Sequence, residues 1–145
     1  MIRSRGLLHV NLNVSDLKRS VQFYTEALGF VIVCEFRETV DPGLGPDTIS
    51  QVILTVPATR TILALTQGPS FPVAAGGLNH LGLVLDSDED VTEMVQRATA
   101  HGGTIQKEGT RERAGVSEAF AYIRDPDGYA IELSTQAVLY AMFTE

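Results

Sequence analysis

Hydrophobic and polar residues follow the same order twice along this chain. Residues 7–14 alternate between apolar and polar side chains, and residues 78–85 repeat this alternation. A period of two predicts a β-strand with one apolar and one polar face, and Leu8 is the first residue of the apolar face in the first strand. The two segments open with Gly-Leu-Leu-His and Gly-Leu-Asn-His, which places His9 and His80 at equivalent positions, 71 residues apart. The chain is therefore predicted to contain two copies of one supersecondary unit.

A helix and three further strands are predicted to follow each of these segments. Apolar residues spaced three and four apart predict helices from Leu17 to Leu28 and from Val91 to Ala98, with capping residues before them and glycines after them. The strands are predicted at residues 30–40, 49–56 and 61–67 in the first half and at 104–109, 118–124 and 129–135 in the second. Each half thus has the order β-α-β-β-β, which predicts an α+β fold.

The chain is interpreted as one domain over residues 1–145, built from two modules. The first module spans about residues 6–67 and the second about 78–135, joined by a linker of glycines and prolines at 68–77. Residues 136–145 form a tail, in which residues 136–143 are predicted to be a short helix that closes the domain or contacts a partner subunit.

Charge and composition narrow the class of partner. The chain has 145 residues, of which 44% are hydrophobic and 20% charged, and its net charge is -7. These are values of a folded globular protein, and the negative charge disfavours binding to nucleic acid or to anionic membranes. We also expect no membrane span and no secretion signal, since no apolar run is long enough. A cytoplasmic protein with a small-molecule partner is the expectation.

The last strands of the two halves align as Leu63-Ala64-Leu65-Thr66 and Ile131-Glu132-Leu133-Ser134. Because successive side chains of a strand point to opposite faces, Glu132 is expected on the face opposite Ile131 and Leu133. By the same alternation, His9 and His80 are expected on the corresponding polar faces of their strands. A mid-strand carboxylate needs a partner, and two histidines with one carboxylate form a metal-binding set that leaves coordination positions open. His9, His80 and Glu132 are therefore the predicted ligands of a divalent metal.

Other side chains allow two interpretations each. A strand histidine by itself is more often a hydrogen-bonded structural residue than a metal ligand. Tyr122 is either a wall of the site with its hydroxyl turned inward or a core residue. Asn11 and Asn13 either support the ligands or line a solvated face. His101 is interpreted as a helix C-terminal cap, and Asp125 as a residue of the last turn.

Four segments resemble the vicinal oxygen chelate superfamily, which includes glyoxalase I, extradiol dioxygenases, fosfomycin-resistance thiol transferases and bleomycin-binding proteins. They are His9–Leu17, Phe23-Tyr24 with Leu28-Gly29-Phe30, Asn79–Gly82, and Asp125–Leu133. The resemblance covers essentially the whole chain. It implies paired βαβββ modules forming a cupped, open β-barrel with helices on the outer face, in a homodimer. It also implies a bound Fe(II), Mn(II), Zn(II), Ni(II) or Co(II) that binds oxygen atoms of the substrate.

The chain departs from each of these groups at particular positions. Glyoxalase I of the bacterial type has a glutamate where Ala64 stands, as fourth ligand and base. Extradiol dioxygenases share the open triad, but their further histidine has no counterpart in residues 111–121. Tyr122 matches a tyrosine of the fosfomycin enzymes, whereas the serine-rich approach to their last hairpin is missing. Bleomycin-binding relatives lack the metal residues.

From these similarities and departures we expect a metalloenzyme, for which more than one reaction is possible. Dioxygenase-like chemistry is narrowly preferred, because Ala64 leaves the metal open, with Fe(II) or Mn(II) as the first choice of metal. A glyoxalase I-type lyase is the first alternative, followed by a fosfomycin-type thiol transferase and by a non-catalytic protein that binds a small molecule such as an antibiotic. Glu132 and Tyr122 are the candidate catalytic residues.

Overall fold

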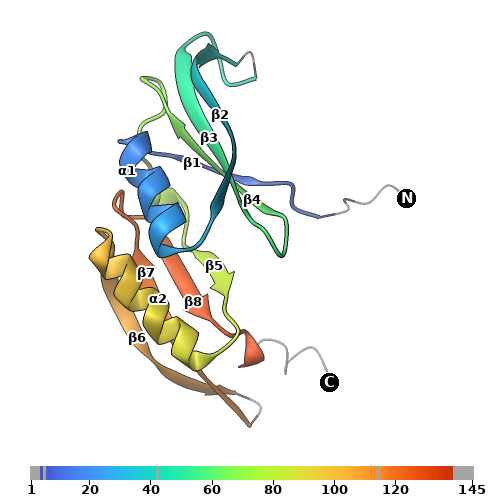
Figure 1. Ribbon diagram of the computed structural model, residues 1–145, viewed down its shortest axis with the longest axis vertical. Helices are drawn as coiled ribbons and strands as arrows, with labels where there is room; N and C mark the ends of the chain where they lie inside the picture. The colour runs from blue at the N-terminus through green and yellow to red at the C-terminus, as the bar shows by residue number, and fades with distance from the viewer. Residues whose placement is uncertain (1–3, 5, 42, 114, 139–145) are drawn as a thin grey trace. The chain divides into compact units, whose positions relative to one another are not determined.

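The computed structural model describes residue 4 and residues 6–41, 43–113 and 115–138 (Figure 1). It divides into two compact units. Unit 1 is the chain up to residue 73 without residues 26–28, and unit 2 is residues 26–28 and the chain from residue 74. Each unit holds a four-stranded sheet, so the predicted α+β class is confirmed. Ala137 and Val138 are helical, and the rest of the helix predicted at 136–143 lies outside the described residues.

Unit 1 is a mixed sheet with one helix. Its elements are β1 (Val10–Asn13), α1 (Leu17–Gln22), β2 (Val31–Val40), β3 (Thr48–Val56) and β4 (Thr61–Gln67). A π-helical segment (Phe23–Ala27) continues α1, and its last two residues belong to unit 2. The strand order is β1-β4-β3-β2, with β1 parallel to β4. α1 packs on β3 and β4, and Leu54, Leu63 and Leu65 are buried on the sheet.

The capping signal at the N-terminus of α1 is confirmed, and the glycine expected after the helix follows the π-helical segment. The side chain of Asp16 accepts a hydrogen bond from the Arg19 amide, at 3.0 Å. Gln67 adds a second acceptor from β4, since its Oε1 takes the amide hydrogen of Leu17 at 2.8 Å. The helical segment ends before Gly29, whose φ of 75° lies in the left-handed region that glycine adopts without strain.

Unit 2 repeats this arrangement. Its elements are a 3-10 turn (Ala75–Gly77), β5 (Leu81–Val84), α2 (Asp88–Ala100), β6 (Thr104–Arg113), β7 (Val116–Arg124) and β8 (Ala130–Ser134), in the strand order β5-β8-β7-β6. α2 lies along one face of this sheet and packs on β6, β7 and β8 (Figure 1). Its buried residues, Val91, Val95 and Ala98, cover the side of the sheet on which Ile123, Ile131 and Leu133 are fully buried. No described helix is long and apolar enough to cross a membrane.

The register of the strands repeats from one unit to the other. Val10 pairs with Leu63, and the residues aligned with them in the second half, Leu81 and Ile131, also pair. Each long hairpin is irregular near the start of its first strand, between Ile32 and Cys34 in unit 1 and between Ile105 and Lys107 in unit 2. The internal repeat therefore extends to β-bulges, which turn side chains to a new face of a sheet.

Three predicted strand boundaries are wrong by three residues or more. β1 and β5 begin just after the histidines, and Leu8 is 75% exposed instead of lying on an apolar face. The reason is that the ladder between β1 and β4 begins at Val10, so the residues before it have no neighbouring strand in unit 1. β6 continues to Arg113 rather than ending at Gly109, since β6 and β7 pair up to Arg113 and Val116.

Candidate functional site

The face of the unit 2 sheet opposite α2 collects polar side chains. Lys107, Tyr122, Glu132 and Gly82 pair in register across β6, β7, β8 and β5, so they form one row. Paired residues project to the same side of a sheet. His80 lies two residues before Gly82 and therefore joins this face. Unit 2 thus brings together three of the residues predicted from the sequence, namely His80, Glu132 and Tyr122.

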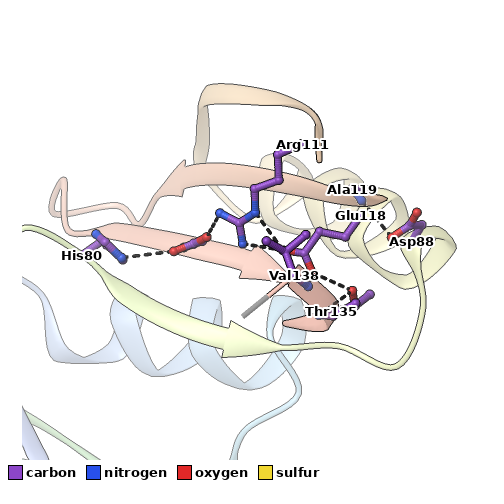
Figure 2. Close-up of polar contacts among 9 residues, drawn as sticks. His80, Asp88, Arg111, Glu118, Ala119, Thr135 and Val138 are labelled. Atoms are coloured by element: carbon purple, nitrogen blue, oxygen red, sulfur yellow. Dashed lines mark hydrogen bonds and ion pairs between the residues drawn. The ribbon is translucent and has the colours of Figure 1, made fainter. Parts of the chain in front are cut away.

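The imidazole of His80 lies between two oxygen atoms. A dashed line in Figure 2 joins its Nε2 to the carboxylate of Glu132, whose Oε2 is 3.1 Å away. Its Nδ1 is 2.6 Å from Asn79 Oδ1. Each oxygen is an acceptor, but a neutral imidazole carries one N–H. When Nδ1 donates to Asn79, the lone pair of Nε2 faces Glu132 Oε2, an arrangement that suits a cation bound between the two atoms. The pair therefore favours a positive charge at this position.

The spacing of these two atoms fits two ligands of one metal ion. Metal–nitrogen and metal–oxygen bonds of about 2.1 Å, at angles of roughly 90–109°, separate adjacent ligand atoms by about 3.0–3.4 Å. The observed 3.1 Å lies in this range. The contact from Asn79 is also the kind that fixes the orientation of a metal-binding histidine. His80 and Glu132 therefore fit the predicted role of metal ligands.

Arg111, on β6, holds the other oxygen of Glu132. Its Nη1 donates to Glu132 Oε1 at 2.6 Å, while its Nε and Nη2 donate to Glu118 Oε1 at 2.7 Å (Figure 2). Glu118 is 1% exposed, and its Oε2 accepts from the Thr135 hydroxyl and, at 3.3 Å, from the Val138 amide. Glu132 is thus anchored through Oε1, which leaves Oε2 turned toward His80.

The network fixes the charges of its members. Burial by itself would raise the pKa of Glu118, but hydrogen bonds from Arg111, Thr135 and Val138 and the charge of Arg111 lower it. Burial would lower the pKa of Arg111, and its hydrogen bonds and ion pairs with Glu118 and Glu132 raise it instead. Both groups are therefore charged at neutral pH.

Tyr122 lies beside the His80–Glu132 pair and not in the core. Its ring meets the His80 ring edge to face, with centroids 5.4 Å apart, and it is half-buried. Burial, and then the nearby carboxylate of Glu132, raise the pKa of Tyr122. Its hydroxyl is therefore protonated at neutral pH and is able to donate a hydrogen bond to a bound group.

His9 lies in unit 1, where it is exposed and directly precedes β1. Near it in the sheet, Thr66 donates to Asn11 Oδ1 and accepts from Gln51 Nε2, both at 2.8 Å. Ala64 pairs with Asn11 as Glu132 pairs with Gly82, so Ala64 is the counterpart of Glu132. Within the described residues, no three His, Cys, Asp or Glu side chains form a group that could hold a metal ion. The triad of His9, His80 and Glu132 stays a prediction.

Two other sequence interpretations are confirmed. His101 is the C-cap residue of α2, and its Nδ1 lies 3.3 Å from Glu26 Oε2. Asp125 Oδ1 accepts from the amides of Asp127 and Tyr129, which closes the last turn.

The sequence interpretation missed Arg111 and Glu118. Their contact follows from the long β6–β7 hairpin, in which Arg113 pairs with Val116 and Arg111 therefore with Glu118. Gly115, with a φ of 73°, was the available signal for a turn at this place. A strand ending at Gly109 leaves Arg111 in a loop, and its partner cannot be inferred.

Residues 6–133 match the Glyoxalase/Bleomycin resistance protein/Dioxygenase superfamily, and the chain belongs to this family. A putative lactoylglutathione lyase of Brassica oleracea var. gemmifera is 32% identical over 136 residues, which are 89% of this chain and 44% of that protein. This chain therefore spans less than half of the plant relative. The lactoylglutathione lyase of Salmonella typhimurium is 31% identical over 136 residues, covering 88% of this chain and 90% of that protein.

A solved structure agrees with this assignment. The trypanothione-dependent glyoxalase I of Leishmania major superposes with a TM-score of 0.69 at 27% identity, over 97% of this chain and 94% of that one. The family assignment and the fold expected from the resemblance are thus confirmed. The names of these relatives favour the lyase alternative over the dioxygenase-like chemistry that the open triad suggested.

Proposed function

We propose that this protein is a divalent-metal-dependent lyase of the glyoxalase I type, acting on lactoylglutathione or a related thiol adduct. The contact between His80 Nε2 and Glu132 Oε2 carries this proposal, because its spacing and its need for a positive charge suit a metal ion. The identity of about 31% to lactoylglutathione lyases over most of the chain supports the reaction class. His9 is the proposed third ligand.

The side chains of unit 2 would have different roles at this site. A bound metal would act as a Lewis acid that stabilises negative charge on a substrate oxygen. His80 and Glu132 would hold it, and the guanidinium of Arg111 binds Glu132 Oε1, which leaves Oε2 turned toward His80. The Tyr122 hydroxyl, protonated at neutral pH, would donate a hydrogen bond to the substrate. Zn(II), Ni(II) or Co(II) suit a lyase of this family, in place of the Fe(II) or Mn(II) expected for oxygen chemistry.

Assays of lactoylglutathione formation and cleavage test the proposal. The protein is stripped of metal, reconstituted with Zn(II), Ni(II), Co(II), Mn(II) or Fe(II), and assayed beside the His80→Ala variant. We expect turnover with at least one metal and its loss in the variant. Ala64→Glu should raise turnover by about 10-fold or more, because it restores a carboxylate able to act as a general base, a group worth 10²–10⁴-fold in rate. If the unmodified protein turns over with none of these metals, or if it cleaves catechols with Fe(II), a lyase is contradicted.

A thiol transferase is the second candidate, and the position of Tyr122 favours it. Its ring meets the His80 ring edge to face, near Glu132, and the resemblance to fosfomycin enzymes implies a tyrosine in this last hairpin. Transfer of glutathione to fosfomycin, measured in the same preparations, distinguishes this candidate from the lyase.

We also propose that the protein is a homodimer. β2 is an edge strand of its sheet, and five of its apolar residues are 44–58% exposed: Val31, Ile32, Val33, Phe36 and Val40. Long exposed apolar edge strands are normally covered by other protein. Light scattering at micromolar concentration should give twice the chain mass, and Phe36→Lys should lower it. A monomeric mass for the unmodified protein would contradict the dimer.

A further inference from the structure

A cavity of about 540 Å³ lies in unit 1, and the described residues that line it all belong to that unit. Its volume is in the range of small-molecule sites. Its apolar side chains come from the end of β1, from β3 and from the segment after β4, namely Val14, Ile49, Pro69, Phe71, Pro72 and Val73. Among the described residues of the wall, one carries a charge, Glu38 of β2. The predicted metal ligands and Tyr122 are not part of this wall.

The segment after β4 is fixed against β3 and forms one wall of the cavity. The Phe71 amide donates to the Gly68 carbonyl at 3.1 Å. The Ser70 hydroxyl donates to the carboxylate of Asp47, which directly precedes β3. Gly68 permits this close approach, because a Cβ at this position would lie 2.9 Å from Ile49 Cγ2 and 3.3 Å from Phe71 Cδ2. The Phe71 ring is therefore part of a preformed wall.

A β-bulge with an unfavourable backbone conformation brings Glu38 to the cavity. The register of β2 and β3 shifts between Phe36 and Thr39, and Glu38, inside this bulge, has a φ of 48°. The left-handed region is unfavourable for a residue with a Cβ. The Ser50 hydroxyl accepts the Glu38 amide hydrogen at 3.2 Å and so stabilises this conformation. Strained backbone that is held in this way is typical of functional positions.

The second unit shows that the fold does not require this bulge. The β6–β7 hairpin of unit 2 repeats the first bulge of the β2–β3 hairpin, but it pairs in regular register from Lys107 to Arg113. Unit 1 thus departs from the internal repeat at Glu38, where it places a carboxylate at a cavity. The position of this side chain accounts for the strain better than strand pairing does.

The carboxylate of Glu38 has no cationic partner in the described part of the chain. No described Lys or Arg pairs with it, whereas the neighbouring Glu35 pairs with Arg37. Arg19 donates to the hydroxyl of Ser15, a residue of the wall, at 2.9 Å, but does not itself line the cavity. The cavity therefore combines a free negative charge with an aromatic ring and apolar walls.

We propose that this cavity binds an organic cation with an apolar body, such as a quaternary ammonium compound. The Glu38 carboxylate would neutralise the charge of the ligand. The face of the Phe71 ring carries partial negative charge and would also attract a cation. The apolar walls would cover the hydrocarbon part of the ligand. The inference does not depend on the proposed lyase reaction, since the cavity uses neither His80 nor Glu132.

NMR titration of the nitrogen-15-labelled protein with benzyltrimethylammonium tests the inference. This probe has no lone pair, so it cannot bind to a metal ion. We expect a Kd in the millimolar range, which suits a probe of this size, and amide shifts concentrated at Glu38, Ser50 and Phe71. Benzyl alcohol shares the aromatic group without the charge, and phenylacetate carries the opposite charge. Both should bind more weakly than the cation.

Substitutions separate the charge of the cavity from its shape. Glu38→Gln keeps the size of the side chain and should weaken binding of benzyltrimethylammonium about 3- to 5-fold, the effect of losing one exposed ion pair. Phe71→Leu should weaken it to a similar extent through the loss of the aromatic face. Benzyl alcohol should bind equally to Glu38→Gln and to the unmodified protein. Glu93→Gln removes an exposed carboxylate of α2 with the same change in net charge, and this control should bind the cation normally.

Glu38→Gly guards against a loss of binding through misfolding. Glycine adopts a positive φ without strain, so this variant should melt no lower than the unmodified protein and still bind the cation more weakly. Equal binding of benzyltrimethylammonium to Glu38→Gln and to the unmodified protein would overturn the inference. Binding of phenylacetate as tight as that of the cation, or amide shifts confined to unit 2, would overturn it as well.

Discussion

Replacing Glu132 by alanine is expected to weaken metal binding by more than about 100-fold and to abolish turnover. Substitutions around a metal ligand already cost about 10- to 100-fold in affinity, and this one removes the ligand itself. The fold should persist, since Glu118 still pairs with Arg111 when Glu132 is gone. Competition with a coloured chelator, on apoprotein titrated with Zn(II), measures the change in affinity.

Glu108→Ala is the matched control for this experiment. Glu108 is an exposed carboxylate on β6 of the same unit, so its removal changes the net charge equally and leaves His80 and Glu132 in place. The control should bind Zn(II) with unchanged affinity. If a folded Glu132→Ala protein binds Zn(II) like the control, Glu132 is not a ligand.

Arg111→Met should cost about 3 kcal/mol of unfolding free energy. Glu118 is 1% exposed, and it would keep its charge without the guanidinium that compensates it. Breaking one partner of a buried ion pair costs about 3–5 kcal/mol, and the partial exposure of Arg111 places this case at the lower end. Urea denaturation monitored by circular dichroism gives the value.

The double variant Arg111→Met with Glu118→Gln separates stability from metal binding. Glutamine removes the buried charge and keeps an oxygen acceptor for Thr135 and Val138, so at least half of the lost stability should return. Metal affinity should stay about 10-fold below that of the unmodified protein, because Glu132 Oε1 has lost its donor. If the double variant binds metal as tightly as the unmodified protein, Arg111 supports the fold and has no role in metal binding.

The features that the sequence predicted well are set by local rules. Asp16 and Ser87 cap their helices as expected, because a side-chain oxygen meets an amide three residues on. The pairing of Val10 with Leu63 and of Leu81 with Ile131 follows from period-two alternation in two aligned halves. Strand parity likewise placed Glu132 on the open face of its sheet.

The features that the sequence did not predict depend on distant partners. Leu8 continues the alternating pattern, but strand pairing starts at Val10 and leaves it exposed. Arg111 meets Glu118 only because β6 and β7 are paired further than their apolar residues extend. The reaction is equally open to several interpretations, since two histidines and a carboxylate serve lyases, transferases and oxygenases alike. The identity to lactoylglutathione lyases, and not the set of predicted metal ligands, favours the lyase.

Metal content of the purified protein tests the central claim most directly. Elemental analysis of anaerobically prepared protein should find close to one divalent ion per chain, and His9→Ala and His80→Ala should each lose it. His101→Ala is the matched control, since His101 caps α2 and lies beside Glu26, and it should retain the metal. No bound metal even after reconstitution, or full retention by the folded His9 and His80 variants, would contradict the account.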